Sequence, residues 1–198
     1  MSSSTRTHSG SEVGAAVGAA VPVARILVAG VGNIFLRDDG FGPEVARYLA
    51  SDSTGLHTGV QIVDYGIRGM HLAYDLLDGV DALILVDAIP ATAPTELGST
   101  GNGPGTIRVL QVGSENLTNA AATPALDPHG MDPMTVLNRL RALGGELPLT
   151  YVVGCIPADI DEGIGLSDAV TRAIPEAAAN IRTLITEHIP SGLSGGEQ

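Results

Sequence analysis

Cysteine and basic residues are scarce in this chain. Cys155 is the only cysteine among 198 residues, so neither a disulfide nor a cysteine-rich zinc site can form within the chain. A chain without internal disulfides suits a reducing compartment, and we expect a cytoplasmic protein. Only 10 lysines and arginines oppose 22 acidic residues, which gives a formal net charge of -12. Because this charge repels polyanions and no basic cluster offsets it, nucleic acid is not expected as a partner.

A long, uninterrupted apolar run is also missing. The apolar stretch over residues 13–31 is broken by glycines, Pro22 and Arg25, and lacks the roughly 20 apolar residues that span a bilayer. Its first half weakly resembles a signal-peptide core, but it continues directly into a strand-like segment. We expect no membrane partner and a monomer. The predicted organisation is a flexible N-terminal extension (1–22), one α/β domain (23–190) and a flexible C-terminal tail (191–198).

Short apolar runs alternate with segments of helical period along the predicted domain. Two strand–helix–strand crossovers in succession require parallel neighbouring strands. The loop over residues 90–104 has no helical period, so the strand after it is predicted to be antiparallel, in a mixed sheet. A last helical segment follows Ser167, and Pro175 is predicted to break it in two. The predicted strands cover residues 24–29, 60–63, 81–86, 106–112 and 149–156, and the predicted helices cover 41–50, 70–77, 134–143 and 175–188.

A glycine-rich turn joins the first predicted strand to the first predicted helix. It carries two adjacent carboxylates, Asp38 and Asp39, where a phosphate-binding loop supplies amides or a lysine. The match to a dinucleotide-binding loop is weak, because Phe35 stands at the position of the third glycine. The turn therefore favours a cation over a nucleotide. Gly30, Gly32, Asn33 and Gly40 are further candidate site positions in this turn.

Further acidic residues follow the neighbouring strands. Asp64 ends the second predicted strand, Asp87 ends the third, and His129 lies just before a helix that must start on the same edge. Ligands of open α/β sheets bind outside the carboxyl ends of the strands, so two or three carboxylates and the imidazole are expected in one cleft. Such a donor set suits a borderline divalent ion such as nickel or zinc.

Each of these residues also has an ordinary structural explanation. Asp38 or Asp39 is explained equally well as a helix N-cap, and Asp64 and Asp87 as turn formers at strand ends. His129 is explained as an exposed loop residue. Only the convergence of the set on one sheet edge favours a metal site.

The sequence resembles the hydrogenase maturation endopeptidases from about residue 25 to residue 189. The ordered set of motifs carries the resemblance: Gly30-Val31-Gly32-Asn33 with Asp38-Asp39-Gly40, then Asp64-Tyr65-Gly66-Ile67-Arg68-Gly69, Val86-Asp87-Ala88, Pro128-His129 and Val153-Gly154-Cys155-Ile156-Pro157. The resemblance implies a three-layer α/β sandwich with a five-stranded, twisted, mostly parallel mixed sheet of phosphorylase/hydrolase-like type. It also implies a protease that trims the C-terminal extension of a NiFe hydrogenase large-subunit precursor after nickel insertion.

The resemblance assigns the metal site to Asp39, Asp87 and His129, and implies that nickel is supplied by the precursor, although other divalent ions fit the same donors. Many family members carry glutamate at the position of Asp39. We hypothesise that Asp38 or Asp64 acts as general base or orienting group, and that Arg68 contacts the terminal segment of the substrate.

Two alternatives remain open from the sequence. A non-enzymatic nickel-binding chaperone would use the same three ligands. Peptidyl-tRNA hydrolases share the Gly-x-Gly-Asn turn, but the Asn-Pro-Gly continuation is absent and the net charge of -12 opposes a tRNA substrate.

Overall fold

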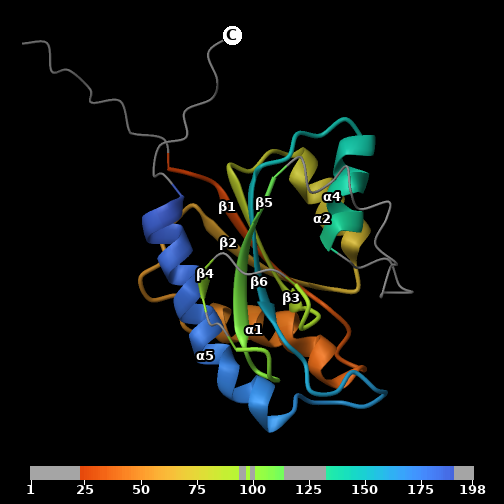
Figure 1. The fold of residues 1–198 in the computed structure, drawn as a ribbon. Coiled ribbons are helices and arrows are strands. Elements are labelled where there is room, and N and C mark those ends of the chain that lie inside the picture. Colours follow the sequence, from red (N-terminus) through yellow and green to blue (C-terminus); the bar gives the residue numbers. More distant parts are fainter. Residues whose placement is uncertain (1–22, 94–96, 99–100, 114–132, 190–198) are drawn as a thin grey trace, which may run out of the picture.

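The central feature of the computed structural model is a twisted sheet with helices on both faces (Figure 1). The structure describes residues 23–93, 97–98, 101–113 and 133–189. The predicted extension over 1–22 and the tail over 191–198 lie outside these residues. Among the described residues, no helix is both long and apolar enough to cross a bilayer.

The sheet has the strand order β2-β1-β3-β6-β5-β4. Its parallel part consists of β1 (Ile26–Val31), β2 (Val60–Gly66), β3 (Ala82–Ala88) and β6 (Leu149–Cys155). The prediction of an antiparallel fourth strand is confirmed, since β5 (Ile107–Val112) pairs antiparallel with β6. A two-residue strand, β4 (Leu97–Gly98), extends the five predicted strands at the edge next to β5. It has too few residues to show an alternating pattern in the sequence.

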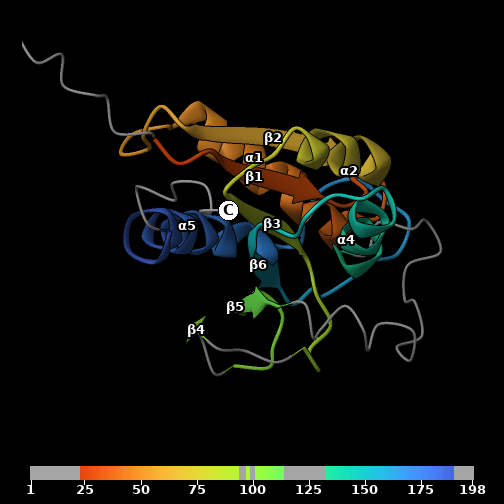
Figure 2. The same ribbon diagram turned by 90° about the horizontal axis from the view of Figure 1, so that it is seen from above.

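The helices form the two outer layers and separate two apolar clusters. On one face lie α1 (Phe41–Ser51) and α5 (Asp168–Thr183), and on the other lie α2 (Gly69–Leu77) and α4 (Pro133–Ala142) (Figure 2). In β3, Ile84 and Val86 pack on the α1/α5 side, while Leu83 and Leu85 pack on the α2/α4 side. Because both faces are covered, β1 is buried along its whole length, as its unbroken apolar sequence predicts.

The last helix differs from the prediction. Pro175 does not break it, because α5 runs continuously from Asp168 to Thr183 and is followed by a π-helix, Leu184–His188. Proline removes one intrahelical hydrogen bond, at a cost of about 3 kcal/mol. Ala173 and Ala177, on either side of Pro175, are both buried in the α1/α5 cluster, and this shared packing keeps the helix intact. The predicted start is confirmed, since Ser167 accepts a hydrogen bond from the Val170 N–H at 3.5 Å.

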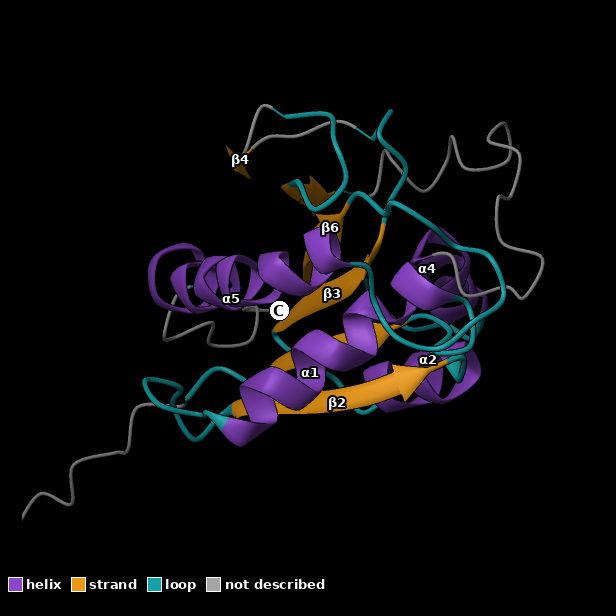
Figure 3. Cartoon of the chain, turned by 90° about the horizontal axis from the view of Figure 1, so that it is seen from below, coloured by secondary structure: helices purple, strands orange, loops and turns teal. Residues whose placement is uncertain are grey.

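The loops after the parallel strands gather at one edge of the sheet, called here the carboxyl edge. The 3-10 helix η1 (Arg37–Gly40) connects β1 to α1 there. The view from below shows α1 beside β2, and α5 on the same side of the sheet (Figure 3). On the other face, α4 begins at this edge, because it ends near the start of β6 at the opposite edge.

Candidate functional site

The glycine-rich turn brings the start of α1 into direct contact with two strand ends. A Cβ atom on Gly42 would lie 2.2 Å from the carbonyl oxygens of Val31 in β1 and Val86 in β3. Gly32 has a φ of +130°, and a Cβ there would lie 1.9 Å from the Asp39 carbonyl oxygen. Gly30 is likewise closed in by the Gly42 carbonyl. The glycines therefore allow η1 to pack against the end of β3, the strand that carries Asp87.

Asp39 is half-buried and oriented by the turn that contains it. The Asn33 N–H donates to Asp39 Oδ2 at 2.6 Å, and the Asn33 side-chain oxygen accepts from the Phe35 N–H at 3.0 Å. These two bonds fold residues 33–39 back on themselves. A carboxylate has about four lone-pair sites, so the Asn33 bond does not by itself prevent an oxygen of Asp39 from donating a lone pair to a metal ion. The ligand role of Asp39 stays a prediction.

Asp87 is a buried carboxylate close to the end of β3. Its side chain is 8% exposed, and Oδ1 accepts from the Ala88 N–H at 2.8 Å. Val86 points to the α1/α5 side, so strand alternation turns Asp87 to the α2/α4 side. Burying a carboxylate is costly unless hydrogen bonds or a cation compensate it. Asp87 therefore lies where a cation would be stabilising.

Asp64 lies on the other side of the sheet. Its neighbour Tyr65 is buried in the α2/α4 cluster, so alternation turns Asp64 to the α1 side, where its side chain is exposed. This arrangement separates Asp64 from Asp87, although both follow parallel strands, and leaves Asp64 as the carboxylate least suited to the expected cleft of two or three carboxylates. The predicted catalytic role of Asp64 remains a hypothesis.

Arg68 holds the same corner of the sheet. Its Nε donates to the Tyr65 carbonyl at 3.1 Å, and its terminal nitrogen donates to the Asp64 carbonyl. The Arg68 side chain is exposed beyond these contacts. Its proposed contact with substrate remains a hypothesis as well.

Asp38 is completely buried and binds a distant loop. Oδ2 accepts from the Ala158 N–H at 2.8 Å, the Asp159 N–H at 3.1 Å and the Ser167 hydroxyl at 2.9 Å. Oδ1 accepts from the Ser167 N–H at 2.6 Å. Burial acts to raise the pKa of Asp38, but the hydrogen bonds from Ser167, Ala158 and Asp159 outweigh it and hold the pKa below its usual value.

Of the roles considered from the sequence, this geometry favours the orienting role for Asp38 over a helix cap or a general base. It does not cap α1, because its acceptors are used by residues 158–167. A general base needs an oxygen that can reach the substrate, whereas Asp38 has no exposed surface. Asp38 instead connects η1 to the start of α5.

Arg108 is a buried charge that the sequence reasoning overlooked. It is 6% exposed, and in the sheet register it faces Gly154, which in turn faces Asp87. Its terminal nitrogen donates to Asn102 Oδ1 at 2.5 Å, while its Nε has no hydrogen-bond acceptor within the described part of the chain. Ile107 and Val109 pack on the α1/α5 side, so Arg108 shares the Asp87 side of the sheet. The sequence feature that could have revealed it is a single arginine within the mostly apolar predicted strand over residues 106–112.

The thiol of Cys155 is not poised for catalysis. Burial and, secondarily, the charge of Asp38 raise its pKa to about 12, so it is protonated at neutral pH. This agrees with the absence of a cysteine nucleophile from the sequence motifs.

The complete three-ligand site involves a position outside the described residues. His129 lies in the segment over residues 114–132, so its relation to Asp39 and Asp87 remains a prediction. Within the described ranges, no group of three or more histidine, cysteine, aspartate or glutamate side chains has the geometry of a metal site.

Comparisons with known proteins agree on one family. Residues 43–184 match the hydrogenase maturation protease family. The hydrogenase 2 maturation protease of Escherichia coli is 33% identical over 168 residues, covering 82% of this chain and 92% of that protein. The solved structure of the hydrogenase maturating endopeptidase HybD from E. coli is 34% identical, covers 79% of this chain and 89% of that one, and superposes with a TM-score of 0.62. A hydrogenase 2 maturation peptidase from a Thaumarchaeota archaeon is 27% identical, covering 82% and 98% of the two chains, with a TM-score of 0.57.

Proposed function

Because this chain belongs to the hydrogenase maturation proteases and is a peptidase of that family, we propose that it removes the C-terminal extension of a NiFe hydrogenase large-subunit precursor after nickel insertion. The observation that best supports the proposal is the packing of η1 against β3, which places Asp39 and the buried Asp87 on neighbouring parts of the carboxyl edge. The carboxylates of Asp39 and Asp87 supply oxygen donors at this edge, and such donors suit the recognition of a metal-loaded substrate.

We propose that nickel in the precursor is bound by Asp39, Asp87 and His129. Carboxylate and imidazole donors fit a borderline divalent ion. His129 precedes the start of α4 by four residues, which span at most about 14 Å. His129 itself lies outside the described residues, so its part in the ligand set rests on the motif resemblance.

The chain's own residues orient this site before substrate arrives. The Asn33 N–H fixes one oxygen of Asp39, and the Ala88 N–H fixes one oxygen of Asp87. Lewis acidity of the precursor's nickel supplies the activation of the scissile carbonyl or of a water molecule. Only a loaded precursor then brings its scissile bond to an activated position, which explains why processing would follow nickel insertion.

A reconstituted cleavage assay tests the function. The purified chain is mixed with nickel-loaded and nickel-free precursor from the organism that encodes it, and the products are weighed by mass spectrometry. A defined C-terminal fragment from the loaded precursor alone supports the proposal. An intact precursor that stays bound to the chain would instead identify a nickel-binding chaperone.

Single substitutions test the ligand assignment separately. Loss of an outer-shell partner costs 10–100-fold in metal affinity or activity, so Asp39→Ala, Asp87→Ala and His129→Ala are each expected to slow cleavage by at least about 100-fold. Asp78→Asn, at an exposed aspartate directly after α2, is the matched control and should cleave normally. Normal cleavage by both Asp39→Ala and His129→Ala would refute the assignment.

A further inference from the structure

Four large apolar side chains are exposed next to the proposed site. Ile34 and Phe35 in the glycine-rich turn, and Ile160 and Ile164 in the loop over residues 157–166, are between 42% and 81% exposed. These four residues are called the apolar rim. Contiguous exposed apolar side chains, unlike singly scattered ones, mark interaction surfaces.

The two loops that carry the rim are held together by backbone hydrogen bonds. The Arg37 N–H donates to the Gly163 carbonyl at 3.1 Å, and the Gly163 N–H donates to the Phe35 carbonyl at 2.8 Å. The buried Asp38 carboxylate adds its four bonds to the same pair of loops. The rim is therefore preorganised, and a partner that binds it pays little to order it.

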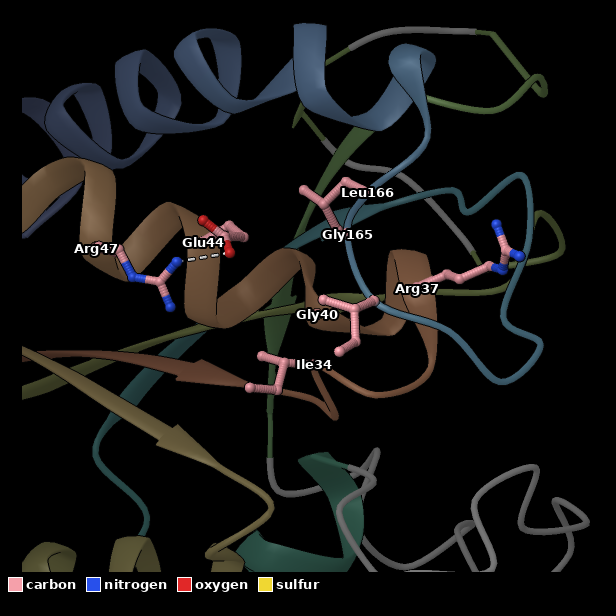
Figure 4. A pocket seen from close by; sticks show the side chains of 8 residues that line it. Ile34, Arg37, Gly40, Glu44, Arg47, Gly165 and Leu166 are labelled. Atoms are coloured by element: carbon pink, nitrogen blue, oxygen red, sulfur yellow. Dashed lines mark hydrogen bonds and ion pairs between the residues drawn. The ribbon is translucent and has the colours of Figure 1, made fainter.

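A hollow of about 220 Å³ lies between α1 and the second of these loops. Ile34, Ile164 and Leu166 give it apolar walls, and the ion pair between Glu44 and Arg47, 2.6 Å long, lies at its margin (Figure 4). Its size suits one inserted side chain better than a length of peptide. Interfaces commonly obtain most of their binding energy from such anchor pockets.

The hollow lies next to the proposed metal ligand Asp39. Gly40, which lines it, directly follows Asp39 in η1. A protein seated on the rim thus lies beside the carboxyl edge where the proposed ligands are. This proximity, together with the proposed function, makes the hydrogenase precursor the relevant protein.

The form of the rim distinguishes among possible occupants. Phe35 and Ile164 are 62% and 81% exposed, so most of both side chains lies outside the hollow that Ile164 helps to line, which fits a broad protein face better than a single extended peptide. The exposed carboxylates of Asp161 and Glu162 lie in the rim's own loop. In a symmetric dimer the same patch meets itself, so these charges would repel a second copy of the chain, whose net charge is -12.

We propose that the apolar rim is the docking surface for the folded body of the large-subunit precursor, which presents an apolar contact bordered by basic residues and inserts one side chain into the hollow. The inference rests on the proposed function and assigns the rim to substrate binding. The C-terminal extension itself occupies the carboxyl edge beyond the rim.

The test compares the double variant Phe35→Ser/Ile164→Ser with Leu143→Ser, which removes an exposed apolar side chain (45%) at the opposite edge. Binding is measured by interferometry to the nickel-loaded precursor, to the mature subunit that lacks the extension, and to a synthetic extension peptide. The double variant is expected to weaken binding of precursor and mature subunit by at least about 10-fold per residue, while Leu143→Ser changes neither. Unchanged thermal melting curves establish that both variants are folded.

Kinetics and salt dependence complete the test. In the double variant KM for the precursor should rise while kcat stays within about twofold, since the rim touches no reacting atom. Glu162→Lys should slow association, most strongly at low salt. The inference would be overturned if the double variant bound the precursor normally, or if it lost binding only to the extension peptide. It would also be overturned if the wild-type chain formed a dimer that the double variant did not. Failure of the wild-type chain to cleave would instead refute the proposed function.

Discussion

Replacing Asp38 by asparagine is expected to destabilise the fold without changing any exposed surface. The carboxylate accepts four hydrogen bonds, one through Oδ1 and three through Oδ2. Asparagine keeps one acceptor oxygen and replaces the other by an NH2 donor. In the better orientation the amide oxygen keeps the three bonds of Oδ2, and the NH2 group then faces the Ser167 N–H.

The magnitude follows from these contacts. Leaving one buried N–H without an acceptor costs about 1–3 kcal/mol, and the other three bonds lose their charge assistance. Relief from burying a charge offsets part of this loss, so we expect a decrease of about 3 kcal/mol in the free energy of unfolding. With a typical urea m-value of about 2 kcal/mol/M, the midpoint falls by about 1.5 M.

Urea unfolding followed by circular dichroism measures the effect, with Asp161→Asn in the same loop as the control. The pH dependence provides a second check. Because the folded-state pKa of Asp38 is held below its usual value of 3.8, its stabilisation is present above that pH and is lost as the pH falls through the folded pKa. The difference between wild type and Asp38→Asn should therefore narrow below about pH 4. The positioning role of Asp38 would be refuted if Asp38→Asn lowered the free energy of unfolding by less than about 1 kcal/mol at pH 7, or if its difference from wild type widened in acid.

Four further substitutions test other parts of the structure. Gly42→Ala should lower stability by at least about 3 kcal/mol in thermal unfolding, because its Cβ would lie 2.2 Å from two carbonyl oxygens; a normal melting temperature contradicts this contact. Pro175→Ala should raise stability by about 1–2 kcal/mol, since alanine restores a backbone donor at an exposed position of α5; a decrease in stability would mean that proline is favoured there. Cys155→Ala should retain full cleavage at a cost of about 1 kcal/mol, whereas loss of cleavage in a folded variant would implicate the thiol. Arg108→Met should keep or raise stability by up to about 1 kcal/mol, because it removes a poorly satisfied buried charge; a loss above about 2 kcal/mol would indicate that the guanidinium is well paired.

The sequence predicts most of the sheet because its signals are local. Unbroken apolar runs mark β1 and β3, and the absence of a helical segment before residue 106 predicts the antiparallel strand β5. Pro175 misleads because its local cost is outweighed by packing against residues distant in the chain. The family is also predictable, since the order of several motifs is specific even where each motif alone is weak.

The candidate site is less predictable because it depends on which face each side chain occupies. The edge position of Asp64 and Asp87 follows from the strands, but their opposite faces depend on the register that buries Tyr65 and Val86. Arg108 joins the Asp87 side through an antiparallel pairing across Gly154, which the motifs do not encode. The sequence therefore predicts which residues lie at the carboxyl edge more readily than which of their side chains contact one another.

The adjacent residues Asp38 and Asp39 point in different directions because of the local geometry of the turn. A 3-10 helix has about three residues per turn, so consecutive side chains leave it about 120° apart. Asp38 therefore points inward to Ala158 and Ser167, while Asp39 points back to the Asn33 N–H at the carboxyl edge. The inward carboxylate fixes the loop that carries half of the apolar rim, and the outward one is the proposed ligand. Two identical side chains thus connect the proposed docking surface to the proposed metal ligand through a single turn, because the turn's pitch decides which of them reaches the edge.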